Sequence, residues 1–174
     1  MRFVTERKPP WFHLINGSVD AMTNAAWRLA TNQLCRVVIR LVRGKKMMRL
    51  QALFDEFSAA LQFPYYFGEN WPAFDECIND LDWLPGESYL VIITDSDRLL
   101  CEDDLEFATL LAVLQEASSR WSEALQVTDE ILRPPAPFHT VLQCEAPEYA
   151  SLRLRLGLTG HAFDEITLEE RGSE

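Results

Sequence analysis

Residues 63–77 read Phe63-Pro-Tyr-Tyr-Phe-Gly-Glu-Asn-Trp-Pro-Ala-Phe-Asp-Glu-Cys77, an aromatic loop that leads into a short helix. Asn70 is a favoured N-cap, because its side-chain oxygen accepts a hydrogen bond from a free N–H in the first turn. Pro72 is tolerated just inside the helix, since its missing N–H would have no partner within the helix. We therefore expect a helix over residues 70–81.

The expected helix has one apolar side and one acidic side. Its apolar positions follow the spacing i, i+3, i+4, i+7 and are Phe74, Cys77, Ile78 and Leu81. Its other side carries Asp75, Glu76, Asn79 and Asp80. Glu76 and Asp80 are like charges at i, i+4, a spacing that costs a helix roughly 0.2–0.5 kcal/mol. A cost without local benefit is compatible with a binding role, and a merely solvated polar face is the alternative reading.

Apolar runs and helical spacing alternate along the rest of the chain. Strands are expected over 11–15, 36–42, 89–94 and 138–143, and helices over 19–31, 48–61, 70–81, 103–125 and 147–156. This alternation predicts an α/β fold with a parallel sheet and right-handed crossover helices. The Pro-rich segment 127–137 is expected to be a loop, and the tail after Gly157 to be irregular.

Spacing also predicts which large side chains form the core. The tryptophans and phenylalanines are expected mostly inside, among them Trp27, Trp83, Trp121 and Phe107. On the helix over 103–125 the expected inward residues are Leu105, Ala108, Leu111, Ala112 and Leu114. Lone histidines are more often structural than catalytic, and His13, His139 and His161 are interpreted in that way.

At the aromatic loop and its helix the chain resembles the barstar family of intracellular ribonuclease inhibitors. The similarity runs without a gap from about Val38 to Asp82, and its most specific part is Tyr66-Phe67-Gly68-Glu69-Asn70-Trp71 with Cys77 following. Weaker similarity continues through 89–94 and 138–143. The resemblance implies an α/β fold, a barstar-like parallel sheet of three to four strands packed with helices, in which 11–15 supplies the fourth strand. It also implies a single domain over 1–174, with a core over 36–143 between extensions over about 1–35 and 144–174.

The resemblance further implies where a partner binds. In the family, the loop and the following helix plug the nuclease active site, and one acid occupies the phosphate-binding site. Glu76 stands at that position, where its carboxylate would accept charge-assisted hydrogen bonds from the Arg and Lys that normally hold RNA phosphate. The expected partner-binding residues are Tyr66, Phe67, Gly68, Asn70, Trp71, Asp75, Glu76, Asn79 and Asp80. Pro72 replaces an acid of the family, Asp75 replaces a tryptophan and Glu76 replaces an aspartate, so barnase itself is not specified as the target.

The charge of −11 is unevenly distributed over the 174 residues. Residues 69–116 carry 13 acidic and 1 basic side chain, whereas residues 1–68 carry 4 acidic and 10 basic ones. The acidic middle opposes binding to nucleic acid or to an anionic membrane and favours a cationic protein partner. It also predicts fast association that weakens with salt.

The chain has no run of 18 apolar residues and no apolar signal segment near its N-terminus, so we expect a cytoplasmic protein.

The remaining motifs of the chain are interpreted as structural rather than catalytic. The four cysteines, Cys35, Cys77, Cys101 and Cys144, form no CxxC pair and are interpreted as reduced core thiols. Gly44-Lys45-Lys46 lacks the spacing of a phosphate loop and reads as a solvated turn. Acidic pairs near Asp95 and Asp103 suit Mg²⁺, but they also suit a strand end and the first turn of a helix.

The leading hypothesis is therefore an inhibitor of a basic ribonuclease, or an immunity protein against a nuclease toxin. We expect it to be no enzyme, to need no cofactor or metal, and to be monomeric when free. One rival is a metal-dependent hydrolase that uses the acidic pairs. The other is an adaptor that keeps the fold and binds a protein other than a nuclease.

Overall fold

The computed structural model describes residues 1, 3–31, 36–127 and 130–167. Its main sheet has five strands in the order β2-β3-β6-β1-β7, and all neighbouring pairs are parallel. The strands are β1 (Phe12–Asn16), β2 (Val37–Arg43), β3 (Ser88–Thr94), β6 (Phe138–Cys144) and β7 (Phe163–Thr167). The predicted α/β class with a parallel sheet is confirmed.

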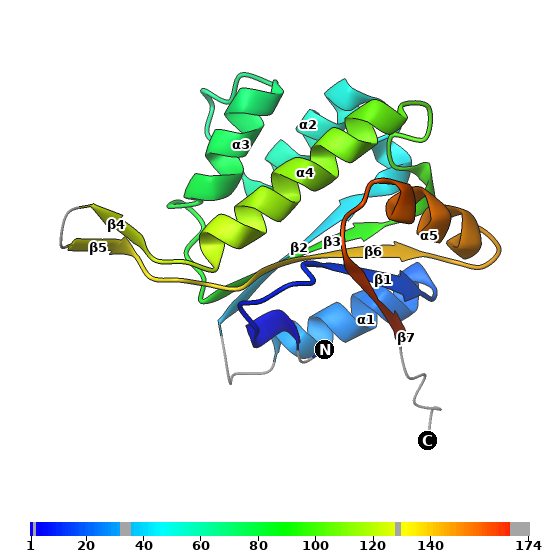
Figure 1. Cartoon of the computed structure of the whole chain (residues 1–174), viewed down its shortest axis with the longest axis horizontal. Helices are drawn as coiled ribbons and strands as arrows, with labels where there is room; N and C mark the ends of the chain where they lie inside the picture. The colour runs from blue at the N-terminus through cyan, green and yellow to red at the C-terminus, as the bar shows by residue number, and fades with distance from the viewer. Residues whose placement is uncertain (2, 32–35, 128–129, 168–174) are drawn as a thin grey trace.

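Helices cover both faces of this sheet (Figure 1). They are α1 (Val19–Ala30), α2 (Leu50–Leu61), α3 (Trp71–Asp80), α4 (Asp104–Trp121) and α5 (Tyr149–Leu158). Short 3₁₀ turns are η1 (Phe3–Thr5), η2 (Gly44–Lys46) and η3 (Ser96–Arg98). Helix α1 and the N-terminal turn η1 pack on one face, while α2, α3, α4 and α5 pack on the other.

The core consists of two apolar layers separated by the sheet. Strands β3 and β6 are buried at every position, as expected for central strands covered on both faces. Because neighbouring side chains of a strand point to opposite faces, Leu90 and Ile92 pack beneath α1 while Val91 and Ile93 pack beneath the other helices. The larger layer, on the side of α3 and α4, supports the surface described below.

The N-terminal strand prediction is confirmed, and the prediction for the tail is wrong. Strand β1 pairs with β6 as the expected fourth strand. Strand β7, in the tail expected to be irregular, pairs with β1 as a fifth. It is an edge strand in which only Phe163 and Ile166 are half-buried, so its sequence lacks the apolar run that marks the central strands.

A second correction concerns the Pro-rich segment after α4. Helix α4 ends at Trp121 rather than near residue 125, and β4 (Leu125–Val127) and β5 (Glu130–Arg133) form an antiparallel pair where a loop was expected. This hairpin projects from the body of the molecule beside the C-terminal ends of α3 and α4 (Figure 1). The chain returns to the body where the Ala136 N–H donates to the Trp121 carbonyl at 2.8 Å.

The predictions for individual core residues are partly right. Trp121 and Phe107 are buried and Trp83 is half-buried, but Trp27 is 67% exposed on the outer side of α1. Leu105 and Ala112 are exposed as well. The buried stripe of α4 runs through Phe107, Leu110, Leu111, Leu114, Ala117, Ser118 and Trp121. Leu105 and Ala112 lie on the opposite side of the helix, because each is displaced from Phe107 by close to half a turn.

The predictions for the cysteines are also partly right. Cys77 and Cys144 are buried as predicted, and burial raises the pKa of the Cys144 thiol to about 12, as for an inert core thiol. Cys101 is exposed, so the prediction of a core thiol is wrong there. Cys35 lies outside the described residues.

Across the described ranges, no helix is long and apolar enough to cross a membrane.

Candidate protein-binding surface

The aromatic loop between α2 and α3 is held by its own hydrogen bonds. The Phe67 N–H donates to the Pro64 carbonyl at 2.9 Å, and Asn70 Nδ2 donates to the Gly68 carbonyl at 2.9 Å. Gln51 of α2 donates to Glu69 Oε2 at 2.6 Å. A loop held in this way loses little conformational entropy when a partner binds.

Two of the predicted binding residues anchor the loop from inside. The Phe67 ring lies edge-on to Phe63 and Phe54, with centroids 5.0 and 5.9 Å away. Trp71 is half-buried against Phe54, and its indole N–H donates to Glu106 Oε2 of α4 at 2.7 Å. Both side chains therefore hold the loop in place, and direct contact with a partner stays a prediction for them.

Two tyrosines form the outer side of the loop. Tyr65 is fully exposed and Tyr66 is 60% exposed, with their rings edge-on at 5.7 Å. Partial desolvation raises the pKa of the Tyr66 phenol, and Cys77, Asp80 and Glu76 raise it further. Tyr65 was absent from the predicted site. Phe63 and Phe67 pack together, and the turn closed by the Phe67 N–H and the Pro64 carbonyl leaves the two tyrosines exposed at its tip.

Helix α3 begins as its sequence predicts. The Asn70 side chain accepts a hydrogen bond from the Ala73 N–H at 3.0 Å, and Pro72 lies in the first turn. Phe74, Cys77 and Ile78 are buried, which fixes the acidic side of the helix toward the surface. The helix ends at Leu81, whose backbone is left-handed at φ 50°.

The carboxylates of α3 differ in their surroundings. Glu76 and Asp80 are exposed and make no hydrogen bond or ion pair with any residue that the structure describes. Asp75 is half-buried: its Oδ2 lies 3.2 Å from Arg120 Nη1 of α4, and its Oδ1 accepts from Asn79 Nδ2 at 3.1 Å. Glu76 thus has no cation beside it among the described residues, Asp80 interacts electrostatically with Arg133 without forming an ion pair, and Asp75 is paired with Arg120.

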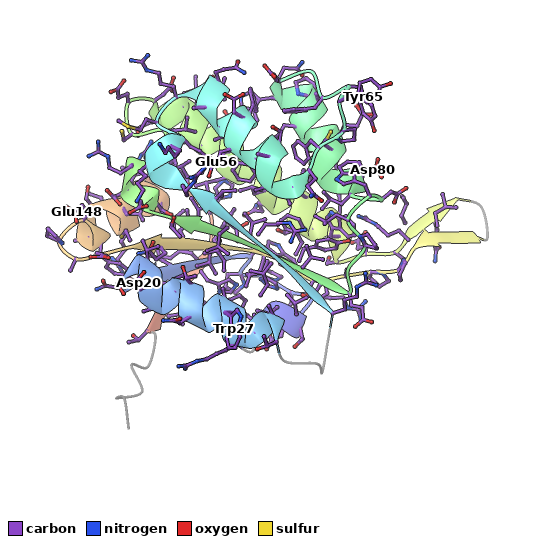
Figure 2. All side chains as sticks on the ribbon, turned by 180° about the vertical axis from the view of Figure 1, so that it is seen from behind. Asp20, Trp27, Glu56, Tyr65, Asp80 and Glu148 are labelled. Carbon is purple, nitrogen blue, oxygen red and sulfur yellow. The ribbon has the colours of Figure 1, made fainter. Side chains whose placement is uncertain are left out.

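A groove of about 590 Å³ runs beside these carboxylates. Its lining residues are Asp75, Glu76, Asn79, Asp80, Asp82, Arg120, Leu125, Leu132 and Arg133. Helix α3 and the residues after it supply one wall, and the β4–β5 hairpin supplies the other. Tyr65 and Asp80 lie on the same flank of the molecule, with Asp80 nearer the hairpin (Figure 2). The hairpin side of this groove was not predicted from the sequence.

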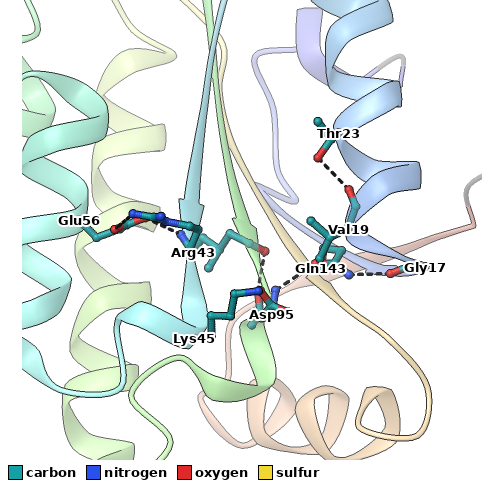
Figure 3. A network of polar contacts seen from close by, with 10 residues as sticks. Gly17, Val19, Thr23, Arg43, Lys45, Glu56, Asp95 and Gln143 are labelled. Atoms are coloured by element: carbon teal, nitrogen blue, oxygen red, sulfur yellow. Dashed lines mark hydrogen bonds and ion pairs between the residues drawn. The ribbon is translucent and has the colours of Figure 1, made fainter.

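The acidic pairs of the hydrolase alternative have structural partners. Asp95 follows β3, its Oδ2 lies 3.1 Å from Lys45 Nζ, and its N–H donates to Gln143 Oε1 at 3.0 Å (Figure 3). Asp103 caps α4 by accepting from the Glu106 N–H at 3.1 Å, and Asp104 pairs with Arg155 at 2.7 Å. Over the described ranges, no group of three or more His, Cys, Asp or Glu side chains is placed to hold a metal ion.

The sequence places this acidic surface in a known family. A family model described as "Barstar (barnase inhibitor)" matches residues 37–133, more than half of the chain. The chain therefore belongs to the barstar family, whose members bind a ribonuclease and are inhibitors rather than enzymes. The matched range extends from β2 to β5 and includes the aromatic loop, α3 and α4. No curated protein sequence matches the chain.

Solved structures with a similar fold come from another group of proteins. The chain matches the Aeropyrum pernix ORC2 protein in its ADP form with a TM-score of 0.59 and 15% identity, over 93% of this chain and 43% of that one. It matches the same protein in its ADPNP–ADP complexes with a TM-score of 0.55 and 14% identity, over 90% and 41% of the two chains. The chain thus spans less than half of these proteins, and such low identity shows a shared fold alone.

Proposed function

We propose that this chain is a cytoplasmic inhibitor of a basic ribonuclease, or an immunity protein against a nuclease toxin. In this proposal the aromatic loop and α3 cover the active site of the nuclease, and Glu76 occupies its RNA-phosphate site. The observation that carries the proposal is the exposed Glu76 carboxylate, which has no cation beside it among the described residues and lies within the range matched by the barstar family model. Membership of the barstar family supports the ribonuclease as partner.

The physical basis of the proposal is mimicry of phosphate by a carboxylate. Guanidinium and ammonium groups that hold an RNA phosphate bind a carboxylate through the same charge-assisted hydrogen bonds. Two features hold the helix that carries this carboxylate in place: the buried side of α3, and the N-cap bond from Ala73 to Asn70. A rigid scaffold lowers the ordering cost of binding, so more of the interaction energy is retained.

The surrounding surface supplies the remaining contacts in this proposal. Tyr65 and Tyr66 offer exposed aromatic area. Tyrosine is enriched at binding hot spots because its side chain has only two rotatable bonds, so ordering it costs little entropy. Asp80 adds a second unpaired carboxylate one turn after Glu76. The excess of acidic residues over 69–116 is expected to attract a basic enzyme from a distance.

An assay of RNA cleavage tests this function. Purified wild-type chain is titrated into barnase and into a panel of basic ribonucleases and toxin nuclease domains, beside the variants Glu76→Gln and Glu148→Gln. Both variants remove one exposed carboxylate, but Glu148 lies at the start of α5, far from α3 (Figure 2). We expect at least one nuclease to be inhibited by wild type and by Glu148→Gln, with a loss of about tenfold or more for Glu76→Gln.

Other outcomes separate the alternatives. A partner that binds at the loop and α3 while RNA cleavage continues unchanged would identify the chain as an adaptor instead. Turnover of a phosphoester by the isolated chain that requires Mg²⁺ would favour the hydrolase. Equal inhibition by wild type and Glu76→Gln would remove Glu76 from its proposed role.

A further inference from the structure

The β4–β5 hairpin is held against α3 and α4 by one arginine. Arg133 donates from Nη1 to the Asn79 carbonyl at 3.1 Å and from Nη2 to the Arg120 carbonyl at 3.3 Å. Its guanidinium lies 3.5 Å from the centre of the Trp121 ring. Charge-assisted hydrogen bonds and a cation–π contact together make a firm attachment, so the base of the hairpin and the end of α3 form one surface.

Two leucines of the hairpin line the groove and remain exposed. Leu125 of β4 is 49% exposed, and Leu132 of β5 is 57% exposed. Across the groove lie Glu76, Asp80 and Asp82. Exposed apolar side chains beside unpaired carboxylates in a concave surface are typical of a site that another protein covers.

The charges of the groove define what fits it. Four carboxylates and two guanidiniums line it. Asp75 and Arg120 pair with each other, and Arg133 is engaged by carbonyls and by Trp121. Glu76, Asp80 and Asp82 therefore remain without an ion pair among the described residues, although Asp82 and Asp80 interact electrostatically with Arg133. The groove keeps an excess of two carboxylates over guanidiniums, so the complementary ligand is cationic with an apolar side chain.

The groove has room for an extended segment rather than a single side chain. A second hollow of about 350 Å³ shares Asp80, Asp82 and Arg133 with it. This hollow continues past the end of α3 toward Glu87 and is also lined by Pro134 and Pro135. The two hollows together suit a peptide segment that runs from the exposed side of α3 past the base of the hairpin.

We propose that this groove is a second docking site, which takes a basic segment of the nuclease next to its active site. An apolar side chain of that segment packs between Leu125 and Leu132, while its Lys or Arg side chains meet Asp80 and Asp82. The proposal rests on the proposed function, because it extends the same binding surface. The hairpin would thereby discriminate among basic nucleases, because affinity depends on the segment next to the phosphate site as well as on the phosphate site.

The first experiment measures the groove without a nuclease. A fluorescent peptide of alternating arginine and leucine is titrated with wild type, with Leu125→Ser/Leu132→Ser, and with Leu154→Ser/Leu158→Ser. The last variant is the matched control, because it removes two exposed leucines from α5. We expect saturable binding to wild type and control, and at least about tenfold weaker binding to the hairpin variant. An arginine–serine peptide is expected to bind more weakly than the arginine–leucine peptide.

Equal peptide binding by the hairpin variant and the control would overturn the proposal. So would an absence of saturable binding to wild type. Because all four leucines are exposed, the variants are expected to fold, and circular dichroism checks this. The variant Asp80→Asn/Asp82→Asn tests the opposite wall of the groove independently, and we expect it to lose the same peptide affinity.

The second experiment separates this proposal from the proposed function. On any nuclease that wild type inhibits, the hairpin variant is expected to raise the inhibition constant about tenfold through faster dissociation. Full inhibition by the hairpin variant would overturn the docking site and leave the inhibitor function standing. Peptide binding at the hairpin with no nuclease inhibited would overturn the inhibitor function and the nuclease as occupant, and would leave the groove as a site for basic, apolar peptides.

Discussion

Arg120 Nη1 of α4 lies 3.2 Å from Asp75 Oδ2 of α3, so two adjacent carboxylates of one helix differ in how freely a partner's cation can reach them. Asp75 is half-buried with a cation beside it, and Glu76 is exposed without one among the described residues. The pairing with Arg120 offsets the charge of Asp75 and leaves Glu76 as the carboxylate with the freer access.

This relationship gives a prediction for Arg120→Gln. Removing the guanidinium makes the surface more negative, so we expect faster association with a basic nuclease at low salt. The pair is partly exposed, with side-chain exposures of 50% and 36%, and such pairs contribute about 0–1 kcal/mol to stability. Stopped-flow association at two ionic strengths checks the rate. A slower rate at low salt would show that Arg120 itself contacts the partner.

Arg133 gives a prediction about stability. Arg133→Ala removes both hydrogen bonds to main-chain carbonyls and the contact with Trp121, so we expect a loss of about 1–3 kcal/mol in the free energy of unfolding. Arg133→Lys should restore only part of it, because an ammonium group lacks the planar fork. Urea denaturation measures the change, with Arg153→Ala as control, since Arg153 makes an exposed pair with Glu165 and no other ion pair among the described residues. An effect no larger than the control would contradict the anchoring role.

A buried histidine pair gives a prediction about pH. His13 Nε2 lies 3.0 Å from His139 Nδ1 beneath the ring of Phe3. Burial, and then the neighbouring His139, lower the pKa of His13 from 6.5 to about 3, and burial lowers the pKa of His139. The unfolded chain therefore binds more protons below pH 6.5. Stability is fully present above that pH and is lost as the pH falls toward 3.

The expected slope from His13 alone approaches about 1.4 kcal/mol per pH unit in that range. Urea denaturation at several pH values measures it for wild type and for His13→Gln, which cannot take up the proton. We expect the variant to show a slope smaller by about one proton. Parallel curves for the two proteins would contradict a neutral buried His13.

Much of the fold follows from local sequence patterns. The cap at Asn70 and the apolar stripe of α3 are local features, and both are observed. Continuous apolar runs mark β3 and β6, because central strands are buried on both faces. Strand β7 lacks such a run, since an edge strand needs few buried side chains. The hairpin was missed because prolines follow it and its described leucines, Leu125 and Leu132, are exposed.

The binding surface was predictable only in part, for a physical reason. Residues of the loop and α3 are contiguous, so their spacing and the family resemblance point to them. The Asp75–Arg120 pair joins two helices, and Leu125 and Leu132 face α3 only through the anchor at Arg133. No spacing rule connects such residues. Similarly, the aromatic character of Trp27 suggests a core position, but its exposed place on α1 depends on how the helix is rotated on the sheet.

Steady-state kinetics of an inhibited ribonuclease tests the central claim most directly, because occupation of the phosphate site must compete with RNA. Rates are measured at varied RNA concentration with no inhibitor, with wild type and with Glu76→Gln. The account predicts that wild type raises the apparent KM and leaves kcat unchanged, and that Glu76→Gln loses most of this effect. Inhibition that lowers kcat with KM unchanged, or that is equally strong in Glu76→Gln, would contradict it.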